Sequence, residues 1–73
     1  MEVEEYLAKL GEKIKRIRLG KGLSQEALAE RLDTKHTQIG RIERGEANVT
    51  IGMLGRIAKE LNISLEELIT IKK

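Results

Sequence analysis

Aliphatic side chains recur at spacings of three and four residues along almost the whole chain, which is the period of one face of an α-helix. The first stretch contains Leu7, Leu10, Ile14 and Ile17, and it predicts a helix from about residue 4 to residue 19. Three later stretches share this spacing: Leu28, Ala29 and Leu32; Ile39 and Ile42; and Leu54, Ile57, Ala58 and Leu61. No strand-like alternation competes, and the chain has no proline to forbid a helix. The sequence therefore predicts an all-α fold.

Capping residues and glycines divide the chain into five predicted helices. The expected N-caps are Ser24, Thr34, Thr50 and Ser64. Ser64 is followed three residues later by Glu67, which predicts a capping box, in which each side chain bonds the other residue's backbone amide. The Gly20-Lys21-Gly22 segment is predicted to end the first helix and Gly45 the third, because glycine tolerates the left-handed conformation of helix C-termini.

The predicted start of the third helix differs from the others. A hydrophobic staple, formed by the residue before the cap and the fourth helical residue, is available to its neighbours as Leu23–Leu28, Val49–Leu54 and Ile63–Leu68. At the third helix these positions hold Asp33 and Gln38, which are polar. A helix start has free amides and partial positive charge, so it suits an anionic partner. Simple exposure to solvent is the alternative.

The composition excludes several classes of protein. Seventy-three residues suffice for one domain, and without cysteine the chain has no disulfide, thiolate or cysteine-based zinc site. A single histidine, His36, cannot form a metal site, and no set of residues typical of a catalytic centre is present. We therefore expect no enzyme, no cofactor and no small-molecule ligand. The absence of a signal peptide and of an apolar run of roughly 18 residues predicts a cytoplasmic protein without a membrane partner.

Positive charge is concentrated in one segment of a chain whose net charge is only +2. Residues 11–21 contain five Lys or Arg against one Glu, hence +4, whereas residues 1–10 contain three Glu and one Lys, hence −2. Such a segment is typical of an edge that faces phosphates, but it is equally typical of a solvated helix face.

Residues 25–45 read QEALAERLDTKHTQIGRIERG, which resembles the Xre/Cro family, the lambda repressor-like type of helix-turn-helix protein. Ala29 stands where two helices of this motif cross closely, and the inward anchors are Leu28, Leu32, Ile39 and Ile42. The resemblance covers about residues 10–69 and implies a compact five-helix DNA-binding domain with a central helix-turn-helix. One domain is expected over residues 1–73, with the helix-turn-helix at 24–44. Residues 1–9 would extend the first helix, and 70–73 would form a tail.

Four positions depart from the expected pattern. The turn of the motif has Asp33 where the family usually has glycine, and aspartate is among the residues that tolerate positive φ. Gly40, inside the third predicted helix, indicates close approach to a DNA backbone or to a partner helix. Gly52 and Gly55 also lie inside a predicted helix. Either another subunit packs closely against them, or the fold tolerates the loss of helix stability that they cause.

The resemblance implies that the recognition helix, at about 35–44, enters the major groove of double-stranded DNA. It points to Lys35, His36, Thr37 and Arg41 as residues that read bases. Arginine can donate twice to guanine, threonine can offer a methyl group to thymine, and histidine can bond a purine N7 or a phosphate. An ordinary polar helix face is the alternative.

A second group of polar residues is expected to position the domain on the DNA backbone. The predicted phosphate contacts are Gln25, Gln38, Arg44, Asn48, Lys13, Arg16 and Lys21. The resemblance also pairs Arg18 with Glu43 as a partly buried ion pair that joins the first helix to the third. This pair would neutralise a carboxylate that otherwise repels phosphate.

The resemblance implies a prokaryotic transcriptional regulator, either a repressor or an activator, that binds a palindromic operator as a homodimer. Leu65, Leu68, Ile69 and Ile71 are the expected dimer surface. The main alternative is an antitoxin or another protein-interaction module, since the same fold occurs in both. The two classes differ in salt dependence, because DNA binding through several phosphates weakens steeply as salt rises.

Overall fold

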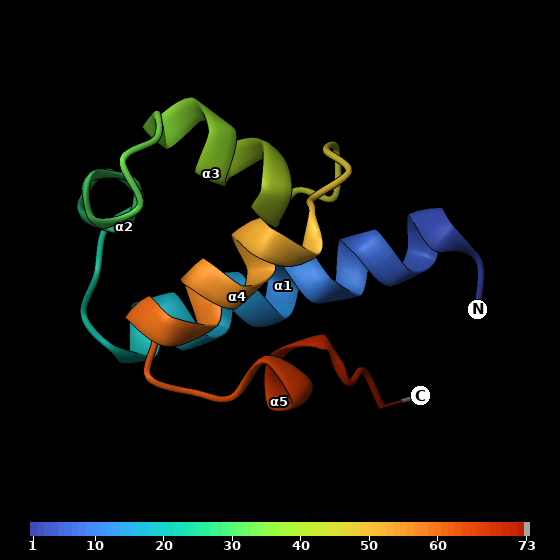
Figure 1. The fold of residues 1–73 in the computed structure, drawn as a ribbon. Coiled ribbons are helices and arrows are strands. Elements are labelled where there is room, and N and C mark those ends of the chain that lie inside the picture. The colour runs from blue at the N-terminus through green and yellow to red at the C-terminus, as the bar shows by residue number, and fades with distance from the viewer. Residues whose placement is uncertain (73) are drawn as a thin grey trace.

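The computed structural model describes residues 1–72, and the predicted tail residue Lys73 lies outside them. Five helices and no strand form within this range (Figure 1). They are α1 (Val3–Gly20), α2 (Gln25–Arg31), α3 (His36–Glu43), α4 (Ile51–Glu60) and α5 (Leu65–Ile69). The predicted all-α, five-helix fold is confirmed. No helix in the described part of the chain is long and apolar enough to cross a membrane.

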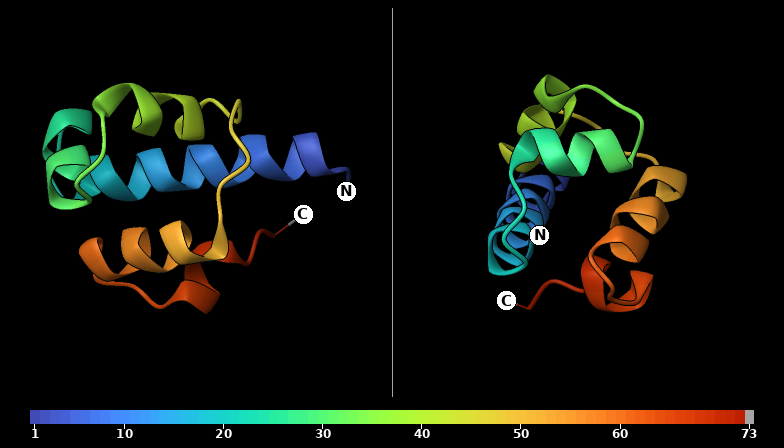
Figure 2. Two further views of the ribbon diagram at one scale, coloured as in Figure 1. Left: turned by 45° about the horizontal axis from the view of Figure 1, so that its top comes forward. Right: turned by 90° about the vertical axis from the view of Figure 1, so that its left-hand side faces the viewer.

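The long helix α1 packs against both α3 and α5. Helix α3 packs against α2 and α1, and α5 packs against α4 and α1. In both views of Figure 2, α3 lies above α1 and α5 lies below it. A residue on α1 can therefore lie near α3 or near α5, depending on the face of α1 from which it projects.

The core gathers the apolar faces of all five helices. The largest side chains with almost no exposure are Leu10, Ile14, Leu28, Leu32, Ile39, Ile57, Leu61 and Leu68. Burial of a leucine or isoleucine side chain contributes about 1.5–3 kcal/mol. In a chain of this size each of these side chains therefore accounts for an appreciable part of the stability.

Three of the four predicted N-caps are confirmed. The hydroxyl oxygens of Ser24, Thr50 and Ser64 each accept a hydrogen bond of 3.0 Å from the amide three residues later. The prediction for Thr34 is wrong, because α3 begins one residue later, with Lys35 as an N-cap that makes no side-chain bond. The amide of Thr34 instead donates to the carbonyl of Ala29 at 2.9 Å, which keeps Thr34 in the turn that ends α2.

The later start of α3 changes its staple positions to Thr34 and Ile39, which still do not form an apolar pair. At α5, Ser64 caps the amide of Glu67 as predicted. Within residues 1–72 the backbone amide of Ser64 donates no hydrogen bond to the carboxylate of Glu67. Only half of the predicted capping box is therefore present.

The first four helices end in the same type of turn. In each, one residue adopts positive φ: Gly22 (73°), Asp33 (55°), Gly45 (76°) and Asn62 (60°). Two backbone amides of each turn bond carbonyls of the preceding helix, as in a Schellman motif. The tight turn at Asp33 is confirmed. Asn62 was not predicted, although asparagine is the usual replacement for glycine at this position.

Candidate nucleic-acid interface

Helix α3 presents one polar face to solvent and one apolar face to the core. Ile39 and Ile42 are buried at 1% and 3% exposure, as predicted from their spacing. The four residues predicted to read bases, Lys35, His36, Thr37 and Arg41, are all exposed. Gln38, predicted to contact phosphate, is half-buried on the flank of the helix. All four residues are therefore accessible to a partner.

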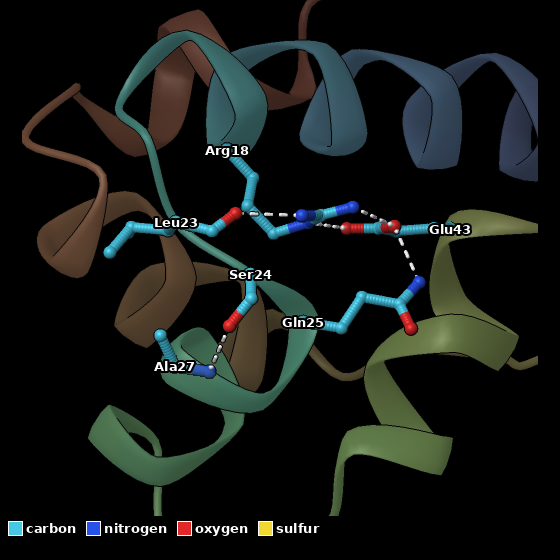
Figure 3. Close-up of polar contacts among 6 residues, drawn as sticks. All are labelled: Arg18, Leu23, Ser24, Gln25, Ala27 and Glu43. Carbon is cyan, nitrogen blue, oxygen red and sulfur yellow. Dashed lines mark hydrogen bonds and ion pairs between the residues drawn. The ribbon is translucent and has the colours of Figure 1, made fainter.

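The predicted ion pair between Arg18 of α1 and Glu43 of α3 is present, and it is buried more deeply than expected (Figure 3). Nε and Nη2 of Arg18 donate to the two carboxylate oxygens of Glu43 at 2.6 and 3.0 Å. The side chains are only 5% and 2% exposed. The hydrogen bond to Glu43 raises the pKa of Arg18 above its ordinary value, against the effect of burial. The pair neutralises a carboxylate at the end of α3 and fixes this end to α1.

Arg18 and Glu43 also hold the segment that leads into α2. Nη1 of Arg18 donates to the carbonyl of Leu23 at 2.7 Å. The Gln25 side-chain amide donates to Oε1 of Glu43 at 3.0 Å. In Figure 3 these groups form one continuous network across α1, α2 and α3. The link from Gln25 to Glu43 was not predicted, and it leaves one N–H of the Gln25 amide for a further acceptor.

Backbone contacts at two glycines bring the C-terminal end of α3 close to α1. A Cβ atom at Gly11 would lie 2.5 Å from the carbonyl oxygens of both Ile42 and Glu43. A Cβ atom at Gly45 would lie 2.8 Å from Cα of Ala8. Gly11 was not predicted as a contact, although a glycine inside a helix indicates close packing. These contacts set the position of α3 independently of any side chain.

The absence of a side chain at Gly40 leaves space for the side chains of Arg44 and Gln25. A Cβ atom there would lie 3.1 Å from Nη1 of Arg44 and 3.6 Å from Oε1 of Gln25. The nearest neighbour from another helix is therefore the Gln25 side chain of α2, and approach of a DNA backbone stays a prediction. Two of the predicted phosphate contacts, Gln25 and Arg44, lie next to each other over α3.

Arg44 is paired with a carboxylate that the sequence analysis did not consider. Its Nε and Nη2 donate to the carboxylate oxygens of Glu46 at 3.0 and 3.3 Å. Both side chains are more than half exposed, at 59% and 55%. The hydrogen bond from Arg44 lowers the pKa of Glu46 below its ordinary value. Asn48 is exposed in the same loop.

Two predicted phosphate contacts on α1, Lys13 and Arg16, lie near the C-terminal end of α5. Nζ of Lys13 donates to the carbonyls of Glu67 and, at 2.8 Å, Thr70, at the C-terminal end of α5. Arg16 lines a pocket with Lys13, Thr70 and other residues of this region. Because α5 and α3 lie on opposite sides of α1, we remove Lys13 and Arg16 from the expected contacts. Lys21 is exposed in the turn that follows α1.

The expected dimer surface also needs one correction. Leu68 is 0% exposed and belongs to the core, because α5 uses it to pack against the body of the domain. Leu65, Ile69 and Ile71 are half-buried around it. A Cβ atom at Gly55 would meet nothing within 4 Å, so packing inside the domain does not explain this glycine. Across residues 1–72 no three His, Asp or Glu side chains are placed to hold a metal ion.

Known proteins match both the sequence and the fold. The sequence profile of the helix-turn-helix family matches residues 14–68. Over 70 residues the chain is 43% identical to control protein C.SmaI of Serratia marcescens, an alignment that covers 96% of this chain and 80% of that protein. The restriction-modification controller protein C.AhdI from Aeromonas hydrophila is 37% identical, with a TM-score of 0.82 over 85% of this chain and 94% of that chain.

A relative solved together with DNA has the same architecture. The structure of SinR, the master regulator for biofilm formation, in complex with DNA matches with a TM-score of 0.78 and 31% identity. The match covers 84% of this chain and 98% of that chain. The profile covers the packed helices from within α1 to α5, including the α2–α3 motif described above. The chain therefore belongs to the helix-turn-helix family and is a domain of the Xre/Cro type.

Proposed function

We propose that this chain regulates transcription by binding double-stranded DNA in a sequence-specific manner, with α3 in the major groove. The observation that carries the proposal is the exposed polar face of α3 on a helix that is fixed from behind by a buried ion pair and by backbone contacts. A recognition element must be held rigidly, because base edges are distinguished by hydrogen bonds with strict geometry. Membership of the helix-turn-helix family and the SinR–DNA structure support the same function.

The residues on the exposed face have distinct proposed roles. Arg41 would donate two hydrogen bonds to O6 and N7 of a guanine, and Thr37 would place its methyl group against a thymine. Lys35 and His36 stand at the start of α3, the part of a recognition helix that contacts base edges in this motif. Sequence preference would therefore arise from these four side chains.

The proposed contacts to the DNA backbone come from residues before, within and after α3 in the chain. Gln25 begins α2, and its amide has one N–H free of Glu43. Arg44 and the exposed Asn48 follow α3 in the chain, and Gln38 lies on its flank. Lys21 is the remaining candidate, at the turn before α2. These residues would set the register of the domain on the duplex without reading sequence.

We further propose that the protein acts as a homodimer on a palindromic site. Helix α3 has only eight residues, which can reach the bases of one half-site. The half-buried residues Leu65, Ile69 and Ile71 remain as the candidate dimer surface. The half-site centres would lie about 10 base pairs apart, so that both recognition helices enter the same face of the duplex.

The proposal is tested by selecting binding sites from random duplex DNA and measuring the mass of the complex by light scattering. A palindromic consensus bound by two chains is the expected result. A single asymmetric site bound by one chain would contradict the dimer. Failure to enrich any sequence would contradict sequence-specific binding itself.

A further inference from the structure

The carboxylate of Glu46 lies among the arginines that the proposed function assigns to DNA. It accepts hydrogen bonds from Nε and Nη2 of Arg44 at 3.0 and 3.3 Å. These bonds lower the pKa of Glu46, and the charges of Arg44 and Arg41 act in the same direction. Glu46 is therefore a counter-charge for the backbone-contacting Arg44 and lies within electrostatic reach of the base-reading Arg41.

The backbone fixes Glu46 in this place. Gly45 has a φ of 76° and packs against Ala8, so the chain turns sharply at the end of α3. The amide of Glu46 then donates to the carbonyl of Arg41 at 2.9 Å. This turn holds Glu46 beside α3, two residues beyond Arg44. The ion pair thus follows from the geometry of the turn as well as from the attraction of the side chains.

The pair occupies the Nε–Nη2 edge of the Arg44 guanidinium and uses two of its five N–H groups. Nη1 lies beside Gly40 and the Gln25 amide, while Nε and Nη2 are already bonded to the carboxylate. A phosphate that approaches Arg44 would meet a guanidinium whose charge is neutralised and a negative group next to it. Because both side chains are more than half exposed, the pair is weak enough for a phosphate to displace it.

We propose that Glu46 limits the DNA affinity of this protein by competing with a backbone phosphate for Arg44. Binding would break the Arg44–Glu46 pair and leave the carboxylate unpaired at the edge of the interface. The inference rests on the proposed DNA-binding function. It assigns a role to a residue that would itself make no favourable contact with DNA.

The test is a titration of labelled duplex, selected and random, with the wild-type protein and Glu46→Gln at several salt concentrations. Glu46→Gln is expected to raise affinity for both duplexes by about two- to fivefold per half-site, the range that corresponds to an exposed ion pair. The salt dependence should steepen by up to about one unit per half-site, because Arg44 then neutralises a phosphate without freeing a carboxylate.

A double variant and a matched control separate competition from a general charge effect. In an Arg44→Ala background, Glu46→Gln should raise affinity by less than in the wild-type background, because only the general repulsion between carboxylate and phosphates remains. Glu12→Gln removes the same charge from an exposed residue of α1 that lines the Arg16 pocket, on the α5 side, and should have no effect. Equal gains in either case would overturn the proposal.

Two further outcomes are distinguishable. A loss of affinity in Glu46→Gln would show that the carboxylate orients Arg44 for phosphate, and it would refute competition while leaving DNA binding intact. If the wild-type protein binds no duplex at all, the proposed function fails and the inference fails with it. The pair itself is checked in the free protein by NMR titration of the Glu46 carboxyl group, whose pKa should rise in Arg44→Ala.

Discussion

Replacing Arg18 with methionine tests the network that holds α3 in place. The change would leave the carboxylate of Glu43 at 2% exposure with one remaining donor, the amide of Gln25. Removal of one partner from a buried ion pair costs about 3–5 kcal/mol. The carbonyl of Leu23 also loses its donor, which adds about 1 kcal/mol. A domain of this length has a total stability of about 4–11 kcal/mol, so Arg18→Met should bring it close to unfolding.

The assay is urea unfolding followed by far-UV circular dichroism, with a double-mutant cycle on Arg18→Met and Glu43→Leu. With a slope near 1 kcal/mol per molar urea, the midpoint of Arg18→Met should fall by about 3 M or more. The double variant replaces both charges with apolar groups and should recover much of the loss, giving a coupling energy of about 2 kcal/mol or more. Arg31→Met makes the same chemical change at an exposed site of α2 and should stay within about 0.5 kcal/mol of wild type.

Two results would refute this reasoning. Additive effects of the two single changes would show that Arg18 and Glu43 stabilise the domain independently. An unfolding midpoint for Arg18→Met equal to that of Arg31→Met would show that other groups stabilise the buried carboxylate of Glu43. Either result would remove the ion pair as the reason for the fixed position of α3.

Three other substitutions test separate parts of the structure. Gly11→Ala should destabilise the domain in urea unfolding by about 1–3 kcal/mol, because the added Cβ meets two backbone carbonyls at 2.5 Å. The control Gly55→Ala has open space and should gain about 0.5–1 kcal/mol; a gain at both positions would contradict the close α1–α3 contact. Leu68→Ala should lower the free energy of unfolding by about 2–5 kcal/mol in the same assay, because Leu68 is buried. A much smaller loss would show that Leu68 is exposed. Arg44→Ala should weaken binding to selected and random duplex by similar factors in titrations; a change in base preference would contradict its role as a phosphate contact.

The sequence predicted the fold and the α2–α3 motif well because the deciding signals are local. Apolar spacing of three and four residues places Ile39 and Ile42 inside, and capping hydroxyls act over three residues, as at Ser24. The turn at Asp33 depends on the φ preference of a single residue. The start of α3 was misplaced by one residue because Thr34 donates its amide backward to α2, which the capping preference alone does not reveal.

The errors at the site come from contacts between distant parts of the chain. The charge of residues 11–21 suggested a phosphate-facing edge, but Lys13 lies on the face of α1 that meets α5. The sequence alone placed Leu68 on a dimer surface, but the packing of α5 buries this side chain in the core. Gly11 was missed because its partners lie across the α1–α3 contact. Glu46 pairs with a residue only two positions away, and it was missed because the pairing depends on the turn at Gly45.

The most direct test of the central claim is the effect of Arg41→Ala on base preference. Arg41 is exposed on α3, opposite the buried isoleucines, where a bidentate contact to guanine is geometrically possible. The measurement is a competition titration of wild type and Arg41→Ala on the selected duplex, on each of its single-base variants and on random duplex. Arg41→Ala should lose about 1–3 kcal/mol of binding free energy per half-site on the selected duplex and show a relaxed preference at one base pair, with other positions unchanged. A uniform loss on every duplex would contradict base reading by Arg41, and unchanged binding throughout would contradict the assignment of α3 as the DNA-facing helix.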